Sequence, residues 1–564
     1  MSDSPSIPSG PDDPYAPPPS FLQRHAEPVA IATVFVTTVL LTVLSFPPLS
    51  TPEFAYAMLV PGVFWAYHAP RWKVYAWTLF AAQAVAWTIL LGWLHHVTWA
   101  GLFLLGPFIG TWVGSWFLAA RWAMPRIIGR PTPVRLVALL GLASAWVLIE
   151  WTRTWVLSGF PWLPLAASQW ERASILQIAA FTGQWGVSFV LVAMNLGFAA
   201  YAHRLFREGE SGLRKRSQEF FLAIFLLLVC LSVHVQESVN RIHYNAPLAR
   251  VAFVQPDIPQ AVKWNPAEGP AILDVLKNTT LAAGAMHPDL ILWPEASTPW
   301  AVKGDAGARD FAESLARHTQ APIVLGTVAF EDAGTPAERW FNAVVAVDPI
   351  ACLQHDYYAK RHLVPFGEYV PLRPVLGWLK KFVEVGDGDF QPGLDSSPLM
   401  VQLHGTSLTV GPLVCYEDVF PELARASVRA GSDFLFVATN DAWYGEGAAA
   451  YQHAAHSVLR AVETRRPVLR CGNAGWSGWI DEFGNARDVL RDDAGSVYFR
   501  GTKTVTVTRD ARWVGRESFY VAHGDWFVLA CAATALLAHA LLTFGPAPKP
   551  DAPADARPSG DAAL

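Results

Sequence analysis

The sequence predicts a polytopic α-helical membrane bundle that carries a layered α/β domain on the outer side of the membrane. Of its 564 residues, 52% are hydrophobic and only 16% are charged. A soluble globular chain usually carries about 25% charged residues, so the composition argues against a protein wholly surrounded by water. Long apolar runs follow one another up to residue 236, and one more lies near 526–543. The segment between them, 237–525, alternates β-rich and helical stretches instead.

About eight apolar runs have the length of a membrane span, because an α-helix needs roughly 20 residues to cross about 30 Å of hydrocarbon. The second run is interrupted by Pro61 and is the weakest of the set. Buried core helices are the alternative, but so many long runs rarely occur together in a water-soluble fold. The expected spans are 28–47, 53–69, 74–95, 98–120, 134–157, 177–202, 218–236 and 526–543.

Basic residues occur in every second loop of the expected bundle. Loops rich in Lys and Arg stay on the cytoplasmic side of a membrane. The intervening loops 48–52 and 96–97 carry neither residue, and the longer loop 158–176 carries only Arg172. We therefore expect both termini in the cytoplasm and 237–525 outside. The basic loop residues are Arg71, Lys73, Arg121, Arg126, Arg130, Arg135, Arg204, Arg207, Arg214, Lys215 and Arg216.

Composition also predicts where the domains begin and end. Residues 1–25 are rich in Pro, Ser and Asp, which is typical of a disordered tail, and 544–564 is expected to be a second tail. Between the tails we expect a bundle of about seven helices at 26–236, the α/β domain at 237–525 and a final transmembrane helix at 526–543.

Charge and cysteine content exclude two further classes of protein. The formal net charge is −5, so no basic field suggests a nucleic acid as partner. Five cysteines in a chain of this length do not make a disulfide framework. Whether Cys352 and Cys471 pair within the outer domain stays open at this point.

Short β-rich runs alternate with helical stretches in the outer domain, as in layered α/β folds. Apolar residues recur with a helical period at 268–286, 306–319 and 448–465. Polar groups gather where the strands end, and open α/β folds usually place their sites there. The β-rich runs are RVAFVQPDI (250–258), DLILWPEA (289–296), PIVLGTVAF (322–330), NAVVAVDP (342–349), SLTVGPLVCYED (407–418) and SDFLFVATND (432–441).

Three of these strand ends carry residues that together make a chemically coherent set. Glu295 follows one strand, Cys415 ends another, and Lys360 lies in YYAKRHLVPFGEYVP. Singly, each has a plainer explanation as a solvated cap, a small buried hydrophobe or a solvated loop lysine. Together, a carboxylate could take the proton of a thiol whose usual pKa is about 8.5. The ammonium group could stabilise the thiolate and an oxyanion, helped by backbone N–H groups after Cys415.

The order of Glu in WPE, Lys before HLVPFGEY and Cys in CYE resembles the nitrilase superfamily, whose members cleave or transfer acyl groups through a cysteine thioester. The motif NDAWYG at 440–445 agrees, and RPVLRCGNAGWSGWID at 466–481 resembles the strand pair behind the catalytic cysteine. The resemblance implies a four-layer α-β-β-α sandwich. It also implies that Glu295 is the general base, Cys415 the nucleophile and Lys360 the stabiliser of thiolate and oxyanion.

A nitrilase-like domain between the penultimate and the last span is a narrower pattern, similar to the apolipoprotein N-acyltransferases of bacteria. LIEWTRTWVLSGFPW (148–162) resembles a signature of that family and contains Glu150, Arg153 and Trp162. Ionisable residues at membrane depth are costly unless paired, so a helix-packing ion pair is an equal alternative for the first two. TGQWGVSF and VQPDIPQAVKW also resemble the family, although Trp185 stands where Tyr is more common. The resemblance covers the chain apart from its two tails.

The resemblance implies a function in lipoprotein maturation. A glycerophospholipid such as phosphatidylethanolamine gives its sn-1 acyl chain to the cysteine, and the α-amino group of an S-diacylglyceryl cysteine in an apolipoprotein then accepts it. The protein would lie in a bacterial inner membrane with its catalytic domain on the periplasmic face. We expect a monomer without metal or organic cofactor, because thiol, carboxylate and ammonium groups suffice. The alternatives are a membrane-bound nitrilase-type amidase with water as acceptor and, without catalysis, a transporter or scaffold.

Further residues receive supporting roles from the same resemblance. Glu368 is expected to support Lys360, Glu417 to orient the site and Tyr416 to shape the pocket, while His362 is interpreted as structural. Apolar loop residues could form a lid that keeps water from the thioester, although packing against the membrane explains them equally well. The candidate lid and substrate-binding residues are Trp162, Trp264, Trp378, Leu379, Phe382 and Asn440.

Overall fold

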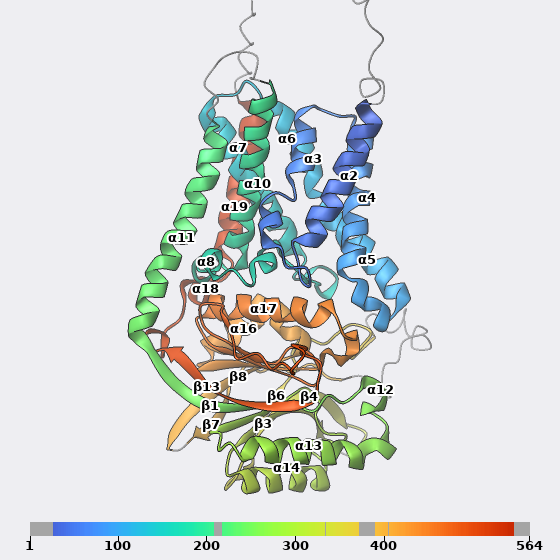
Figure 1. Ribbon diagram of the computed structural model, residues 1–564, viewed down its shortest axis with the longest axis vertical. Helices are drawn as coiled ribbons and strands as arrows, with labels where there is room; N and C mark the ends of the chain where they lie inside the picture. The colour runs from blue at the N-terminus through green and yellow to red at the C-terminus, as the bar shows by residue number, and fades with distance from the viewer. Residues whose placement is uncertain (1–25, 208–216, 333, 371–389, 404, 546–564) are drawn as a thin grey trace, which may run out of the picture.

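The computed structural model describes residues 26–207, 217–332, 334–370, 390–403 and 405–545. Figure 1 shows a helical bundle at one end of the molecule and two stacked β-sheets flanked by helices at the other. The predicted fold class, a membrane bundle with a nitrilase-like α/β domain, is confirmed. Several earlier expectations lie outside the described residues, namely the tail 1–25, all but the first two residues of the tail 544–564, the basic residues Arg214, Lys215 and Arg216, and the lid residues Trp378, Leu379 and Phe382.

Six helical segments of the described chain are long and apolar enough to cross a membrane. Their number fits the predicted architecture roughly, because two of the expected spans take another form. Helix α4 (Trp72–Leu90) is as long as α2 but contains Lys73 and Gln83, which lower its hydropathy. The six segments are α2 (Ala26–Leu44), α5 with α6 (Trp99–Gly114 and Trp116–Ile127), α7 (Thr132–Thr152), α10 (Gln184–Arg207), α11 (Gln218–Tyr244) and α19 (Trp526–Phe544).

The expected second span, 53–69, is not one continuous helix. It forms the 3₁₀ turn η1 (Pro52–Tyr56) and then α3 (Val60–Tyr67), which has only eight residues. Pro61 lies in the first turn of α3, where a missing N–H costs no hydrogen bond. Eight residues rise about 12 Å, which is too short to cross the hydrocarbon. The prediction of a full span here was therefore wrong.

The expected span 177–202 begins later than predicted. Two four-residue turns, α8 (Ala173–Leu176) and α9 (Ala179–Thr182), precede α10. The second turn, α9, ends at Gly183, whose φ is +67°. A Cβ atom added at this glycine would lie 2.7 Å from the ring of Tyr520. A residue with a side chain would fit neither that backbone conformation nor that contact. The left-handed conformation of Gly183 interrupts the helix between α9 and α10. At the other boundary, α11 continues to Tyr244 instead of ending at 236 and leads directly into the α/β domain.

The basic loops lie at the end of the bundle that is remote from the sheets. The Arg130 guanidinium donates to the carbonyl oxygen of Leu542 at 3.3 Å, which joins the α6–α7 connection to the end of α19. Arg71 forms an ion pair of 2.9 Å with Glu27 in the first turn of α2. The start of α2 and the end of α19 therefore share this basic end, away from the α/β domain (Figure 1).

Two β-sheets form the centre of the outer domain. The first has the order β13-β1-β2-β3-β4-β5, with β6 (Tyr358–Ala359) also paired to β4, and the second has the order β12-β11-β10-β9-β8-β7. The first sheet comprises β1 (Asn245–Gln255), β2 (Leu290–Trp293), β3 (Ile323–Glu331), β4 (Arg339–Asp348), β5 (Cys352–Leu353) and β13 (Gly501–Asp510). The second comprises β7 (Leu399–Leu403), β8 (Thr406–Val414), β9 (Phe434–Thr439), β10 (Val468–Gly472), β11 (Gly478–Ile480) and β12 (Ala486–Arg487).

Alternating side chains assign the faces of the sheets to separate cores. Leu290 and Leu292 of β2 point into the core between the sheets, together with Phe434 and Phe436 of β9. Ile291, between the two leucines, packs under α13 (Gly269–Gly284) and α14 (Ala306–Thr319). The remaining face of the second sheet is covered by α16 (Pro421–Arg429) and α17 (Ala448–Thr464). The layers therefore follow the expected order α-β-β-α.

Helix α17 lies between the second sheet and the membrane bundle (Figure 1). Apolar residues of α17 belong to the same continuous core as those of the bundle helices. The two halves of the protein thus share one apolar interface rather than a flexible connection. This places the ends of β8 and β9, which lead toward α16 and α17, beside the bundle.

Candidate active site

Three strand ends of the outer domain bring Glu295, Lys360 and Cys415 together. Glu295 comes two residues after β2, Lys360 follows β6, and Cys415 follows β8 as the first residue of the 3₁₀ turn η7 (Cys415–Val419). Gly326 of β3 allows the turn at Glu295 to approach, because an added Cβ would lie 2.6 Å from the Glu295 Cα atom. All three side chains are buried.

Lys360 lies between two carboxylates. Its Nζ atom is 2.9 Å from Glu368 and 3.8 Å from Oε1 of Glu295. The amide of Asn342, on β4, donates to Oε1 of both glutamates at 2.8 Å. Burial by itself would lower the pKa of Lys360, but Glu368 and Glu295 raise it above its usual value, so the ammonium form is held. Within the described chain, Oε2 of Glu295 has no hydrogen-bond partner, so it is available to accept a proton.

Cys415 occupies a backbone conformation that few residues with side chains adopt. Its φ is +51°, in the left-handed region, and such strain concentrates at functional sites. Burial is the main cause that raises the pKa of its thiol; Glu295 raises it further and Lys360 opposes it. The thiol therefore needs a base to take its proton, and the coupling to both side chains places them within electrostatic reach of it.

Glu417 joins two segments of the chain. One is the lysine loop, residues 358–362, which carries Lys360, and the other is the nucleophile turn, residues 414–419, which carries the predicted nucleophile Cys415. Its Oε1 accepts the N–H groups of Arg361 and His362 at 2.6 and 3.1 Å. Its Oε2 accepts the N–H of Val414 and the hydroxyl of Tyr358, both at 2.7 Å. Because Tyr358 to His362 flank Lys360 and Val414 precedes Cys415, this carboxylate fixes the two segments relative to each other.

Sequence reasoning missed two residues of this site, Lys263 and Asn342. Lys263, in the short helix α12 (Gln260–Lys263), is 4% exposed and donates to the main-chain oxygen of Glu295 at 2.9 Å. Burial lowers its pKa to about 8, while Glu295 and Cys415 act in the opposite direction. A signal was present, since Lys263 adjoins Trp264 in the motif VQPDIPQAVKW and Asn342 opens an otherwise apolar run.

Comparisons with known proteins identify the family. A model described as carbon-nitrogen hydrolase matches residues 250–508, and one described as the apolipoprotein N-acyltransferase N-terminal domain matches residues 39–197. The chain is 35% identical over 420 residues to an apolipoprotein N-acyltransferase of Geobacter metallireducens, covering 72% of this chain and 74% of that one. The chain belongs to the apolipoprotein N-acyltransferase family.

Other similar proteins include an apolipoprotein N-acyltransferase of Pseudomonas aeruginosa, 32% identical over 68% of this chain and 71% of that one. A crystal structure of an amidase from Nesterenkonia sp. is 19% identical, with a TM-score of 0.33 over 47% of this chain and 92% of that one. The protein is an acyltransferase of the nitrilase superfamily. The expectation of an enzyme, rather than of a transporter or scaffold, is thereby confirmed.

In this acyltransferase the membrane bundle reaches the nucleophile turn through Trp162. The indole is 1% exposed and stacks on the ring of Tyr416 at a centroid distance of 6.5 Å. It donates to Oε1 of Gln452 at 2.8 Å, as does the indole of Trp93 at 3.0 Å. Gln452 of α17 in turn donates to the carbonyl oxygens of Pro47 and Leu90. The Tyr416 hydroxyl donates to the carbonyl oxygen of Gly159, so both ring stacking and a hydrogen bond join the residue after Cys415 to the loop that carries Trp162.

Glu150 and Arg153 each hold the loop that carries Trp162. Glu150 accepts the N–H of Leu165 at 2.6 Å. Arg153 donates to the carbonyl oxygens of Phe160, at 3.2 Å, and of Trp162, and its guanidinium lies over the Trp87 ring. Both side chains therefore bind the loop backbone, which supports a role in shaping the loop.

Trp264 and Asn440 occupy different settings near the site. Trp264 follows Lys263 and is 49% exposed, so its role as a lid residue stays a prediction beside packing against the membrane. Asn440 is buried at the end of β9, donates to Gln260 at 2.8 Å and accepts from Asn473 at 3.0 Å. Asn440 thus anchors α12, which carries Lys263.

Two remaining predictions concern side chains near or within the sheets. His362 packs on Phe420 with a centroid distance of 3.8 Å, and burial lowers its pKa to about 4. Cys352 and Cys471 are both free. The Cys471 thiol lies between the sheets against the carbonyl oxygen of Val254, whereas Cys352 lies near Arg317 at the surface.

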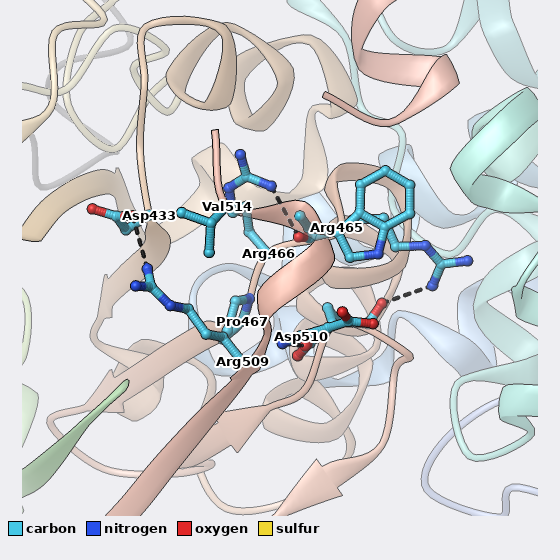
Figure 2. A pocket seen from close by; sticks show the side chains of 9 residues that line it. Asp433, Arg465, Arg466, Pro467, Arg509, Asp510 and Val514 are labelled. Carbon is cyan, nitrogen blue, oxygen red and sulfur yellow. Dashed lines mark hydrogen bonds and ion pairs between the residues drawn. The ribbon is translucent and has the colours of Figure 1, made fainter. Parts of the chain in front are cut away.

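A hollow lined by charged residues lies at the other end of β9 and β10 from Cys415, beside Asp433 and Pro467 (Figure 2). Arg509 pairs with Asp433 at 2.9 Å, and Arg466 donates to the backbone oxygens of Ser432 and Arg516. This arrangement supports the start of β10, and no cysteine, serine or threonine is among the described residues that line the hollow.

Proposed function

We propose that this acyltransferase moves the sn-1 acyl chain of a glycerophospholipid, through a thioester on Cys415, to the α-amino group of a diacylated apolipoprotein. The observation that carries the proposal is the set of three buried groups at one strand-end cluster. A thiol on a strained turn lies beside a carboxylate with an unpartnered oxygen and an ammonium group held by two glutamates.

In the first half-reaction, Oε2 of Glu295 takes the thiol proton and the Cys415 sulfur attacks the ester carbonyl carbon. Lys360 and backbone N–H groups stabilise the tetrahedral oxyanion. Glu295 returns the proton to the departing oxygen, so the C–O bond breaks and a lysophospholipid leaves. The acyl chain remains on the sulfur as a thioester.

In the second half-reaction, the α-amino nitrogen of the S-diacylglyceryl cysteine attacks the thioester carbonyl. Glu295 accepts a proton from the amine, and the C–S bond breaks as the amide forms. The thiolate that leaves is stabilised by Lys360, and the proton on Glu295 restores the resting thiol. Phosphatidylethanolamine is the proposed donor, and a triacylated lipoprotein is the product.

The shared interface between the outer domain and the bundle supports a site that lipids reach from the membrane. Both substrates are anchored in a bilayer, so the thiol must be reached from the side of the bundle; the shared core of α17 and the bundle, and the stacking of Trp162 on Tyr416, support this approach. We propose an inner-membrane protein with both termini in the cytoplasm, because basic residues gather at the end that carries α2 and α19. The outer domain then lies in the periplasm, and a single chain contains all the proposed catalytic groups, so a monomer suffices.

The test uses the full-length protein in detergent with phosphatidylethanolamine whose sn-1 chain is isotopically labelled, and a synthetic diacylated lipopeptide as acceptor. We expect the label as an amide on the lipopeptide and an equal amount of lysophospholipid. An unlabelled acyl chain on the lipopeptide, with the label retained in the lysophospholipid, would show transfer from the sn-2 position and contradict the proposed regiochemistry.

The alternative, a nitrilase-type hydrolase, differs only in the acceptor of the second half-reaction. It predicts labelled free fatty acid at the same rate with and without the lipopeptide. The buried position of Cys415 favours transfer, because a thioester that is shielded from water survives until the amine arrives.

A further inference from the structure

A buried network of charged side chains lies directly behind the nucleophile turn. His453 of α17, Asp418 of η7, Asp441 after β9 and Arg470 of β10 contact one another, and each side chain is 0% exposed. Arg470 lies 3.0 Å from Asp418 and 3.2 Å from Asp441. Burial of four ionisable groups costs desolvation free energy that ion pairing only partly repays. The proposed acyl transfer uses none of the four.

The surroundings of His453 require both of its ring nitrogens to carry a proton. Nε2 lies 3.1 Å from the carbonyl oxygen of Cys415, which can only accept a hydrogen bond. Nδ1 lies 2.9 Å from Oδ1 of Asp441, a carboxylate that also accepts from Arg470. Oδ1 of Asp418 lies 2.9 Å from Nε2 as well. With oxygen acceptors at both nitrogens, the ring is an imidazolium.

The pKa directions agree with this geometry. Burial and Arg470 act to lower the pKa of His453, but Asp418 and Asp441 raise it above its usual value. Although burial opposes it, His453 and Arg470 hold the pKa of both aspartates below their usual range. The network therefore contains two positive and two negative groups and carries no net charge.

We propose that His453 is a positioning residue that sets the orientation of the Cys415–Tyr416 peptide and the electrostatic potential at the Cys415 thiol. This inference rests on the proposed role of Cys415 as nucleophile. In a trans peptide the C=O and N–H groups point in opposite directions. Because His453 binds the Cys415 carbonyl, the Tyr416 N–H points away from the network and serves as an oxyanion donor.

The positive charge of His453 also affects the electrostatic potential at the Cys415 thiol. Without it, the network would retain Arg470 and two aspartates, a net charge of −1 beneath the thiol. Asp441 already raises the pKa of Cys415, so an uncompensated negative charge raises it further. The other groups that act on the thiol are Glu295, Lys360, Lys263, Tyr444 and Arg470, and those that face His453 are Asp418, Asp441, Arg470 and His456.

The experiment compares the pH dependence of Cys415 alkylation by iodoacetamide in the full-length protein, followed by peptide mass spectrometry. His453→Gln is expected to move the profile up by one pH unit or more, so that alkylation at pH 7 is at least about tenfold slower and recovers at alkaline pH. Asp441→Asn is expected to move it down, and the double variant, whose network is again neutral, to return it to within about threefold of wild type.

His456→Gln is the matched control. His456 lies three residues along α17, is equally buried, and accepts the N–H of Leu163 rather than contacting Cys415. Its substitution is expected to leave the profile in place. Circular dichroism and thermal melting in the same detergent verify that each variant is folded. Because His453→Gln and Asp441→Asn are expected to shift the profile in opposite directions, either variant alone tests the proposal if the other does not fold.

Two results would overturn the proposal. One is a His453→Gln profile that coincides with the wild-type profile. The other is alkylation that is slower by the same factor at every pH and is not restored in the double variant, as a purely packing role predicts. The role of Cys415 is tested separately by acylation of the wild-type protein with phosphatidylethanolamine, since alkylation does not depend on Cys415 being the nucleophile.

Discussion

Glu417→Gln tests whether the lysine loop must be tied to the nucleophile turn. The carboxylate accepts three backbone N–H groups and one hydroxyl, and its side chain is fully buried. Glutamine retains one oxygen, which can serve Arg361 and His362, but its NH₂ group then faces the N–H of Val414. One buried donor without a partner costs about 1–3 kcal/mol.

The effect on catalysis follows from the same contacts. If the loop moves to relieve the clash at Val414, Lys360 moves with it, and a displacement of about 1 Å costs about 100-fold in rate. We therefore expect Glu417→Gln to form acyl-enzyme about 10- to 100-fold more slowly than wild type. Glu417→Ala leaves all three N–H groups unpaired, which costs at least about 3 kcal/mol, and should also lower the melting temperature.

The assay is time-resolved intact-mass measurement of acyl-enzyme formation from phosphatidylethanolamine, with thermal melting in the same detergent. Glu313→Gln is the matched control, because Glu313 also accepts a backbone N–H, that of Leu353, but lies on α14 away from the site. Wild-type acylation rates in Glu417→Gln would refute the reasoning.

Three further predictions concern the base, the second lysine and the interface. Glu295→Gln should retain the fold and lower acyl-enzyme formation by about 10²–10⁴-fold, measured by intact mass; equal rates at pH 7 would remove Glu295 as the base. Lys263→Met leaves the buried main-chain oxygen of Glu295 without its donor, at about 1–3 kcal/mol, so we expect a lower melting temperature by calorimetry and slower acylation by rapid quenching and intact mass at a temperature where the variant is folded; an unchanged acylation rate would limit Lys263 to a structural role. Gln452→Leu leaves the indoles of Trp93 and Trp162 without their acceptor, at about 1–3 kcal/mol each, and should lower the melting temperature markedly, whereas a variant as stable as wild type would show that this glutamine does not secure the interface.

Much of the fold could be predicted because its signals are local. The strands that precede Glu295 and Cys415 are apolar runs that end in polar residues, and α17 shows a clear helical period. The strand β13 was missed although the alternation in GTKTVTVTRD is typical of a half-buried strand, because the other strands were recognised by continuous apolar runs, which β13 lacks. The short α3 was overestimated because its apolar composition resembles that of a span, and only the packing shows where the helix ends.

The candidate site was predictable where a motif joined the residues and not where only tertiary contacts do. Glu295, Lys360 and Cys415 are separated by many residues, yet each follows a strand in a recognisable motif. Lys263 lies in the motif VQPDIPQAVKW but not at a strand end, and Gln452 lies in no motif; a single lysine beside a tryptophan, or one glutamine in an alanine-rich helix, usually faces solvent. Their function depends on partners such as the Glu295 carbonyl and the Trp162 indole, which only the folded chain brings near.

The identity of the acylated atom is the most direct test of the proposed chemistry. Wild-type protein and Cys415→Ala are incubated with phosphatidylethanolamine without acceptor, and proteolytic peptides are analysed for a hydroxylamine-sensitive acyl group. We predict a thioester on the peptide that contains Cys415 in the wild type, no acyl group in the variant, and loss of the group when a diacylated lipopeptide is added. An acyl group on another residue, or its persistence in folded Cys415→Ala, would contradict the assignment of the nucleophile.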